Sequence, residues 1–345
     1  MTLTLISIGL TDEKDISQRA LEEARSCDTL YAELYTMILD TDHTRLGHII
    51  GKPVRPLTRS QLEEESDTLI DEAKTKKIGI LVGGDALTAT THISLLLDAA
   101  KKAVKTKIIH GSSILTAIAE TGLNPYKFGR TVTLPLPEKA PPDTVLKTLT
   151  ENQEHGLHTL ILLDIDTQNR RAHTIPHAIQ ILIETEKPGI FDGNTLAIGV
   201  ARLGWRDQTI KADKAGNLSN HDFGDPPQAL IVPGRLHFLE AEALKAIAGC
   251  PPEALEAHKP TGTLDKLIGK YSKGCRKAID ELETIDPPKN LTPDEVKALI
   301  EHAERYLNDA DHYAGERKPT ALASVSYAEG ILDALRLLGL VEFEW

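Results

Sequence analysis

Cysteine, aromatic residues and positive charge are scarce in this sequence, and each shortage excludes a class of protein. The 345 residues hold only 4% aromatics and three cysteines, Cys27, Cys250 and Cys275, which lie far apart and lack C-x-x-C spacing. They therefore indicate neither a zinc knuckle nor a disulfide framework, a pattern typical of a reducing, cytoplasmic compartment. Lysine and arginine number 39 against 51 aspartates and glutamates, for a net charge of -12. Because such a field repels phosphate backbones, we expect no nucleic-acid partner.

Long apolar runs are missing as well. None approaches the roughly 18 residues that a membrane-spanning helix needs, and the first residues turn charged without a basic leader. We therefore expect a cytoplasmic protein without a signal peptide or a membrane segment. The remaining composition, 41% hydrophobic and 26% charged, is typical of a globular chain, and the length allows two or three domains.

Short β-rich runs alternate with amphipathic helical stretches from residue 1 to about 250, which predicts βαβ units and a largely parallel sheet. Turn formers at 124–130 place one α/β domain at 1–130 and a second at 131–257. Over 258–345 the periodicity is helical only. The sequence thus predicts an α/β fold of two halves with a cleft between them, followed by a small all-helical domain.

The periodicity also predicts individual elements. The expected strands are residues 3–8, 29–35, 78–82, 107–110, 131–134, 158–165, 195–202 and 228–232. The expected helices are residues 16–27, 60–73, 89–103, 113–120, 143–154, 175–186 and 236–248.

The most informative local feature is a strand that ends at Gly83-Gly84 and is followed by Asp85. Ligands of open parallel sheets lie at the carboxyl ends of strands, where glycines let the backbone approach and a carboxylate takes an ammonium or hydroxyl group. A tight turn in which Asp85 merely caps a helix explains the same residues equally well. The segment is neither G-x-G-x-x-G nor a Walker loop, so it does not indicate a dinucleotide or triphosphate site.

Other polar motifs have simpler explanations. His173 and His177 have the spacing of a shared metal site, but Pro176 between them and the lack of a third ligand favour solvent-facing histidines. Ser113 precedes a predicted helix, where serine is more often a cap than a nucleophile.

Several segments in order along residues 1–257 resemble one family. They include GLTDEKDI at 9–16, YAELYT at 31–36, GD and ATTH within 84–92, YKFGRT at 126–131, GLHTL at 156–160, LDI at 163–165, and DFGDPP continuing to LIVPG within 222–234. These segments are similar to those of the diphthine synthases, S-adenosylmethionine-dependent methyltransferases of the tetrapyrrole-methylase fold group. The resemblance implies two α/β domains with the cofactor in the cleft between them, a homodimer, and no metal.

The resemblance also carries a set of cofactor contacts to this chain, namely Leu10, Asp85, Thr88, Ser113, Ile114, Leu163, Leu203 and Gln228. The chain departs from the family pattern at Gly83 and Ala86, where prolines are common, and at Leu203, which replaces a smaller residue. Gln228 stands where histidine is usual. Contacts through backbone groups survive these changes, whereas a contact through an imidazole would not. The resemblance assigns no catalytic residue.

The reaction that the resemblance implies is trimethylation of the amino group of the 3-amino-3-carboxypropyl-histidine of translation elongation factor 2, giving diphthine in diphthamide biosynthesis. The amino group gains bulk with each methyl transfer and ends as a quaternary cation. Acidic or aromatic side chains around it would suit that cation, and Tyr35 and Tyr126 are candidates by residue type. Two alternatives stay open. One is a methyltransferase of the same fold that acts on a tetrapyrrole or ribosomal RNA, and the other is an inactive cofactor-binding scaffold with a partner-binding tail.

The C-terminal segment resembles a small helical domain of unknown function found in archaeal-type proteins, through YLNDA at 306–310 and the run 321–336. Its apolar stripe consists of Ala321, Val325, Ala328, Ile331, Leu332 and Leu335. Small residues in such a stripe permit close helix approach, so we expect it to pack inside this domain.

Overall fold

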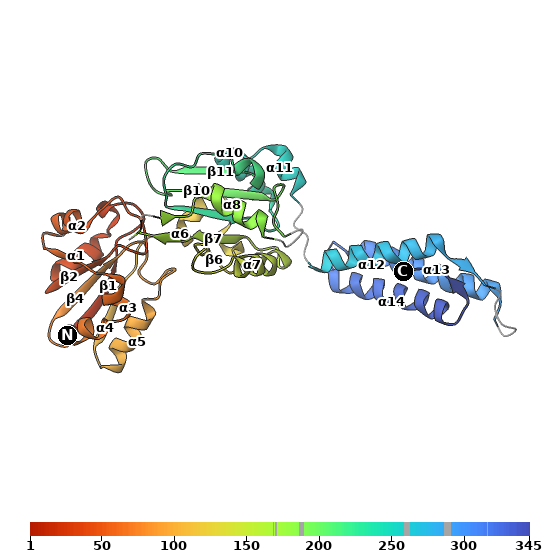
Figure 1. Cartoon of the computed structure of the whole chain (residues 1–345), viewed down its shortest axis with the longest axis horizontal. Helices are drawn as coiled ribbons and strands as arrows, with labels where there is room; N and C mark the ends of the chain where they lie inside the picture. Colours follow the sequence, from red (N-terminus) through yellow and green to blue (C-terminus); the bar gives the residue numbers. More distant parts are fainter. Residues whose placement is uncertain (168, 170, 186–189, 259–262, 286–290, 316) are drawn as a thin grey trace. The chain divides into compact units, whose positions relative to one another are not determined.

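The computed structural model describes the whole chain except residues 168, 170, 186–189, 259–262, 286–290 and 316. The chain forms two compact units. The first comprises Met1–Asn152 and Leu157–Lys259, and the second comprises Gln153–Gly156 and Pro260–Trp345. Two α/β halves make up the first unit and three long helices dominate the second (Figure 1). The last residue of the predicted helix 175–186 lies outside the described residues.

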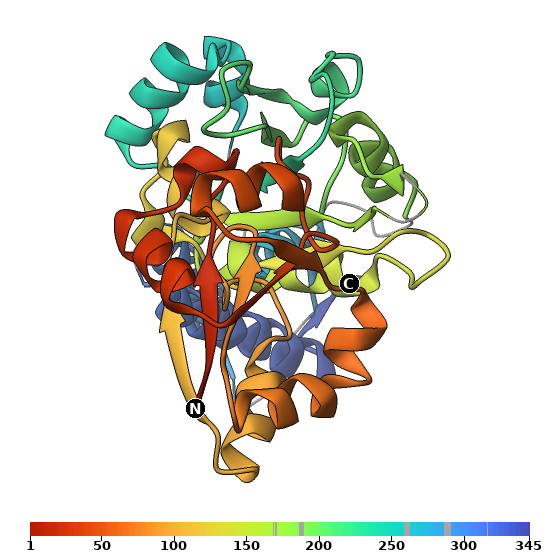
Figure 2. The ribbon, with the colours of Figure 1, turned by 90° about the vertical axis from the view of Figure 1, so that its left-hand side faces the viewer.

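A five-stranded parallel sheet forms the first half, in the order β3-β2-β4-β1-β5. Its strands are β1 (Thr2–Ser7), β2 (Thr29–Glu33), β3 (Val54–Pro56), β4 (Lys77–Val82) and β5 (Lys105–Ile109). Figure 2 looks onto this half and shows the arrowheads of β4, β1 and β5 pointing the same way. Leu3, Leu5, Ile78 and Ile80 are fully buried, as expected for a parallel sheet covered by helices. The carboxyl ends of all five strands therefore share one edge.

The helices of this half connect its strands. They are α1 (Gln18–Ser26), α2 (His43–Ile50), α3 (Arg59–Glu63), α4 (Ser66–Ala73), α5 (Ile93–Lys101) and α6 (Ile114–Ala117), with short 3-10 turns η1 (Glu13–Asp15), η2 (Ile118–Thr121) and η3 (Pro125–Lys127). α5 begins at Ile93, later than the predicted residue 89. The intervening segment is irregular, and Ala89 in it has a φ of 55°, which a helix does not allow. Asp85 consequently does not cap a helix.

The second half contains a mixed sheet in the order β11-β10-β12-β7-β6. Its strands are β6 (Val132–Leu134), β7 (Thr159–Leu163), β10 (Leu196–Ala201), β11 (Thr209–Lys214) and β12 (Gln228–Val232). β6 and β7 pair in parallel, whereas the other neighbours pair antiparallel. The α/β class is confirmed, but the expectation of a largely parallel sheet is wrong for this half. β10 and β11 are joined by a short loop that is too short for a parallel crossover.

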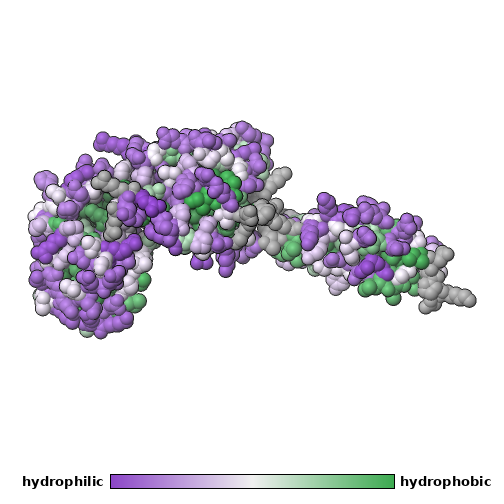
Figure 3. Space-filling model, in the orientation of Figure 1, coloured by the Kyte–Doolittle hydropathy of each residue, from purple (hydrophilic) through white to green (hydrophobic). Residues whose placement is uncertain are grey.

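Helices and a small hairpin complete the second half. They are α7 (Asp143–Glu154), α8 (Ile175–Glu184), α9 (Ala215–Leu218), α10 (Phe238–Ala248) and α11 (Pro252–Ala257), and the hairpin of β8 (Ile165–Asp166) and β9 (Arg171–Ala172). The core of this half includes a close contact between Gly199 in β10 and the ring of Phe223. On the face shown in Figure 3 most of the surface is hydrophilic, and a small apolar area lies over α8.

The second unit is a helical domain, as the sequence predicts. Its elements are α12 (Thr263–Glu281), α13 (Pro293–Tyr313), α14 (Lys318–Leu337), β13 (Glu283–Thr284) and β14 (Val341–Glu342), and the three helices lie side by side (Figure 1). The predicted apolar stripe on α14 packs inside this unit, with Ala321, Val325, Ala328 and Leu332 fully buried. Among the residues that the structure describes, none of the helices combines the length and the apolar character of a membrane span.

Candidate functional site

A cavity of about 300 Å³ lies between the two halves of the first unit. Such a volume is within the range of small-molecule sites, at its lower end. One wall follows the carboxyl ends of the first sheet, and the other comes from β7, β10 and β12 of the second sheet. The lining includes Leu10, Asp85, Thr88, Ser113, Ile114, Leu163, Leu203 and Gln228, which are the eight residues that the resemblance named. The fold thus brings residues that are far apart in sequence to one surface.

Three tight turns form the floor of the cavity, one after each of β1, β4 and β5. Gly84 N donates to the carbonyl oxygen of Gly9 at 2.7 Å, and Gly9 N donates back at 3.2 Å. Gly9 has a φ of 108°, and a Cβ there would lie 2.6 Å from Cβ of Asp15. At Gly111 a Cβ would lie 2.7 Å from Cβ of Ser7. Only glycine allows these turns to pack so closely and present their backbone to the cavity.

Asp85 joins two of these turns and faces the cavity. Its Oδ1 accepts from Leu87 N at 3.0 Å and from Thr88 Oγ1 at 3.3 Å, and its Oδ2 accepts from Gly111 N at 3.2 Å and lies 2.7 Å from His110 Nδ1. Burial alone would raise the pKa of Asp85, but these donors outweigh it and hold the pKa below its ordinary value. The carboxylate is therefore anionic at neutral pH. Asp85 thus organises a turn without capping a helix, and it also lines the cavity.

Arg202 closes the cavity from the second half in a strained backbone conformation, with a φ of 51°. Its Nε donates to Asp207 Oδ2 at 2.8 Å, and its Nη2 donates to the carbonyl oxygens of Asp207 and Phe223, each at 3.0 Å. Nη1 donates to the carbonyl oxygen of Asp225. Atoms of the protein accept from each of these guanidinium nitrogens. Arg202 therefore positions the loop that follows β10 and the loop that precedes β12, rather than binding a ligand.

Two further residues fix this wall. Both polar atoms of the Gln228 amide have a protein partner, since Oε1 accepts from Ile175 N at 2.8 Å and Nε2 donates to the carbonyl oxygen of Gly224 at 2.6 Å. Gln228 thus holds in place both the start of α8 and the loop that precedes β12. Trp205 lines the cavity and donates from Nε1 to the carbonyl oxygen of Leu10 at 3.1 Å, which ties the second half to the first.

Several residues of the lining have no signal in the sequence. Arg59, Arg202, Trp205 and Met37 reach the cavity only because of the order of the strands. The two tyrosines considered for an aromatic wall are not part of the lining. Tyr126 is 95% exposed, and the phenol of Tyr35 is buried elsewhere, which raises its pKa.

The expectation of solvent-facing histidines is wrong for His173, which is 1% exposed. Its Nε2 lies 2.9 Å from the carbonyl oxygen of Pro135, and its Nδ1 lies 3.3 Å from Nδ1 of His177. The ring is buried just before the N-cap residue of α8, where these two contacts enclose it. Within the described residues, no three histidine, cysteine, aspartate or glutamate side chains are grouped so as to hold a metal ion.

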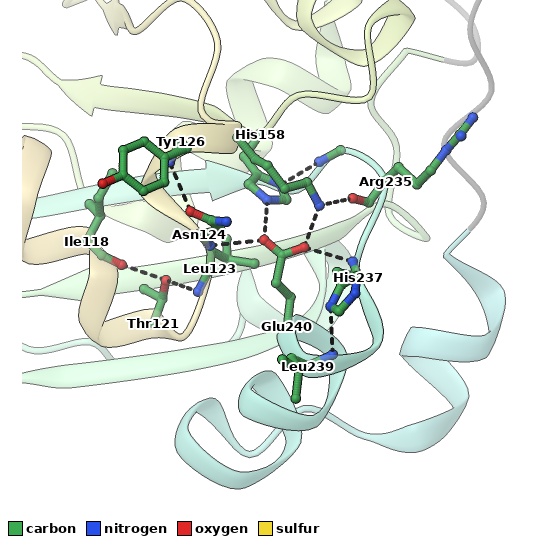
Figure 4. A network of polar contacts seen from close by, with 12 residues as sticks. Ile118, Thr121, Leu123, Asn124, Tyr126, His158, Arg235, His237, Leu239 and Glu240 are labelled. Atoms are coloured by element: carbon green, nitrogen blue, oxygen red, sulfur yellow. Dashed lines mark hydrogen bonds and ion pairs between the residues drawn. The ribbon is translucent and has the colours of Figure 1, made fainter.

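A second polar cluster lies around Glu240 of α10 (Figure 4). Oε1 of Glu240 accepts from Asn124 N at 2.9 Å and lies 3.0 Å from His158 Nε2. Oε2 accepts from His237 N at 2.7 Å and from Lys127 Nζ at 2.5 Å. The cluster thus joins η3, the residue before β7, and α10, and its contacts extend along the segment that connects the two halves.

These contacts determine the protonation states of the cluster. Gly234 N donates to His158 Nδ1 at 3.0 Å, so the proton of the neutral imidazole is on Nε2, which donates to Glu240. Burial lowers the pKa of His158 despite the neighbouring carboxylate. Burial would raise the pKa of Glu240, but the donors from His237, Lys127, Asn124 and His158 lower it to about 2. Glu240 is therefore a structural anion, 3% exposed, outside the cavity.

Comparison with known proteins identifies the family. Residues 2–219 match the family model of the Tetrapyrrole (Corrin/Porphyrin) Methylases, and residues 270–341 match that of a protein of unknown function (DUF357). A diphthine synthase of Methanosarcina acetivorans is 42% identical over 265 residues, which cover 74% of this chain and 98% of that protein. One from Methanocaldococcus jannaschii is 40% identical over 250 residues, 70% of this chain and 97% of the relative.

A crystal structure of diphthine synthase superposes with a TM-score of 0.70 at 38% identity, covering 75% of this chain and all of that one. The sequence resemblance is thereby confirmed across both α/β halves. The methylase model ends at residue 219, before the helical unit, and the second model matches residues within that unit. The chain belongs to the diphthine synthase family of tetrapyrrole methylases and is an S-adenosylmethionine-dependent methyltransferase.

Proposed function

We propose that this chain transfers methyl groups from S-adenosylmethionine, bound in the cavity between its α/β halves, to the amino group of the 3-amino-3-carboxypropyl-histidine of translation elongation factor 2. The product is diphthine, within diphthamide biosynthesis. One observation supports this most strongly: the eight residues named by the resemblance line a single cavity in a unit that covers nearly the full length of diphthine synthases. Neither a tetrapyrrole nor ribosomal RNA as acceptor has comparable support.

The residues of the cavity suit the cofactor. Asp85 supplies an anionic carboxylate for a cationic group, and the glycine turns supply backbone that can be closely approached. Apolar side chains such as Ile114, Leu163 and Leu203 provide surfaces for an adenine ring and an aliphatic chain. When bound, S-adenosylmethionine supplies a methyl group on cationic sulfur, and the methyl carbon bonds to the amine nitrogen as the carbon–sulfur bond breaks and its electron pair stays on sulfur.

The contribution of the chain is alignment and exclusion of water. Arg202 holds the loops of one wall, and Trp205 ties that wall to Leu10 of the other. The acceptor nitrogen must be unprotonated for each transfer, so three transfers to an ammonium group release three protons and leave a trimethylammonium group. The proposal includes a homodimer, as the resemblance implies. It also includes a reaction without metal, because a sulfonium is already an activated leaving group.

Mass spectrometry tests the acceptor. Elongation factor 2 that carries the 3-amino-3-carboxypropyl-histidine is incubated with this chain and S-adenosylmethionine. Three methyl increments on that one residue are expected. No increment, with the cofactor shown to bind by calorimetry, would reject this acceptor.

Asp85→Asn tests the location of the cofactor. We expect the affinity for S-adenosylhomocysteine to fall about tenfold or more, because the variant removes the anionic acceptor that orders two turns of the floor. Asp98→Asn, at a half-buried position on α5 outside the lining, is the matched control and should bind as the wild type does. Isothermal calorimetry measures both variants. Unchanged affinity in Asp85→Asn would show that the cofactor is not held at this turn.

A further inference from the structure

The cavity extends beyond the turns assigned to the cofactor. Those turns follow β1, β4 and β5, which are adjacent strands at the middle and one edge of the first sheet. The lining also includes Thr36–Ile38, after β2, and Arg59, after β3, and these two strands form the opposite edge. β3 is three strand spacings from β1, roughly 14 Å. One cavity therefore has two ends with different residues.

Arg59 is the distinctive residue of this second end. Arg59 and Arg202 are the cationic side chains of the described lining. Arg202 is 7% exposed in its side chain and has its donors engaged by the protein. The side chain of Arg59 is 51% exposed, and its nearest carboxylate is that of Glu63, with Nε to Oε1 at 3.7 Å, beyond hydrogen-bond distance. Its guanidinium lies over the ring of Tyr35, 5.3 Å from the centroid, and makes no hydrogen bond to any described residue.

These contacts leave a positioned cation with free donors. The guanidinium carbon lies over an aromatic ring, a contact that favours this position of the cation, while its N–H groups stay available. A planar fork of N–H donors binds a carboxylate through two parallel hydrogen bonds. Asp85 and Asp164, the acidic side chains of the described lining, are the wrong partners for a carboxylate, so an anionic group is favoured beside Arg59.

We propose that Arg59 binds the carboxylate of the acceptor's 3-amino-3-carboxypropyl group and so directs its amine toward the cofactor end of the cavity. This inference rests on the proposed function and names a substrate-binding residue for it. Methylation changes the amine at each transfer, whereas the carboxylate is the same in every intermediate. A contact between Arg59 and the carboxylate therefore holds the acceptor through successive transfers. It leaves the space around the nitrogen free for the added methyl groups.

The test separates the acceptor from the cofactor, because both carry an amino acid carboxylate. The variants are Arg59→Gln, Arg59→Lys and the control Arg19→Gln, which removes an exposed arginine of α1 outside the lining. Calorimetry with S-adenosylhomocysteine should give the same affinity for all of them. Affinity for elongation factor 2 carrying the modified histidine, measured with S-adenosylhomocysteine present, should fall about tenfold to a hundredfold in Arg59→Gln. Arg59→Lys should recover part of this loss.

A second acceptor tests the chemistry of the contact. Elongation factor 2 with a 3-aminopropyl-histidine, which lacks the carboxylate, should bind the wild type as weakly as the complete acceptor binds Arg59→Gln. Arg59→Gln should bind the two acceptors with equal affinity. A loss of S-adenosylhomocysteine affinity in Arg59→Gln would overturn the proposal and assign Arg59 to the cofactor. Equal acceptor binding by wild type and Arg59→Gln would also overturn it.

Failure of the proposed function would look different. Wild type that binds the modified protein in an Arg59-dependent way but transfers no methyl group would reject the reaction and support the subsite. Wild type that methylates the protein, with Arg59→Gln unchanged in binding and in KM for the acceptor, would support the reaction and reject the subsite. Circular dichroism melting of each variant identifies any loss of fold.

Discussion

Buried charges in the first unit each have several partners, and these contacts determine which protonation states the fold tolerates. Glu240 is 3% exposed, yet its pKa falls to about 2, because four donors outweigh the cost of burial. Asp85 and Arg202 show the same principle at the cavity, where the protein itself engages their polar atoms. Arg59 differs from these buried residues, because its side chain is half exposed and makes no hydrogen bond to a described residue, and for that reason it carries the substrate proposal.

Glu240→Gln should lower the free energy of unfolding of the first unit by about 3 kcal/mol. A glutamine in this place leaves the Lys127 ammonium without its countercharge and replaces one acceptor with a donor. Glu242→Gln, on the exposed side of the same helix, should change the free energy by less than about 0.5 kcal/mol. Urea unfolding at neutral pH compares the two, and equal effects would contradict a structural role for Glu240.

The pH profile of the same variants provides an independent readout. The folded pKa of Glu240, about 2, lies below its ordinary value of 4.5, so its stabilisation is complete above about pH 4.5 and is lost as the pH falls toward 2. The folded pKa of His158 lies below its ordinary 6.5, so protonation of the unfolded chain favours unfolding below about pH 6.5. Both effects weaken the fold in acid. Glu240→Gln should flatten the profile below about pH 4.5 and leave the decline near 6 in place.

At the scale of secondary-structure elements, burial decides how well the sequence predicts each one. β12 begins and ends at the predicted residues, because it is buried throughout and four of its five residues form a continuous apolar run. β11 has no such signal. Its sequence, TIKADK, carries two lysines, which is how an edge strand of a sheet is typically marked. Because the sequence does not predict β11, it also does not predict that the second sheet is mostly antiparallel.

Gly199→Ala should destabilise the first unit by about 1–3 kcal/mol. Its Cβ would lie 2.3 Å from Cζ of Phe223, and this ring is 2% exposed and has no room to move. Gly330→Ala on α14 is the matched control, because no atom lies within 4 Å of the new Cβ and alanine favours the helix by about 0.5–1 kcal/mol. Unfolding midpoints should therefore shift in opposite directions. Destabilisation by both changes would show that the close contact is not the cause.

At the scale of the whole molecule, the two units have separate cores. The apolar cluster of the helical unit is formed by described residues between 264 and 343, and the cavity is lined by residues between 10 and 229. The two family models likewise match separate parts of the chain, 2–219 and 270–341. The alignments with two diphthine synthases span 70–74% of this chain but 97–98% of the length of those relatives. The α/β unit thus corresponds to a complete protein in these relatives.

A chain that ends at residue 258 should fold and bind S-adenosylhomocysteine within about twofold of the full chain. The reason is that removal of the helical unit takes away no lining residue of the cavity. Calorimetric titration of both chains measures this, and thermal unfolding of the full chain should show one transition more than the shortened one. A large loss of affinity on truncation would indicate that the helical unit shapes the cofactor site.

The sequence by itself determined the α/β class, the helical C-terminal part and the family, because periodicity and ordered motifs are local properties of the chain. It also named eight residues of one cavity, although their role toward the cofactor is a proposal. Only the tertiary structure decided that the second sheet is mostly antiparallel, that His173 is buried, and that Arg59, Arg202 and Trp205 reach the cavity. Each of these depends on strand order or on packing between distant segments, and no short stretch of sequence encodes either.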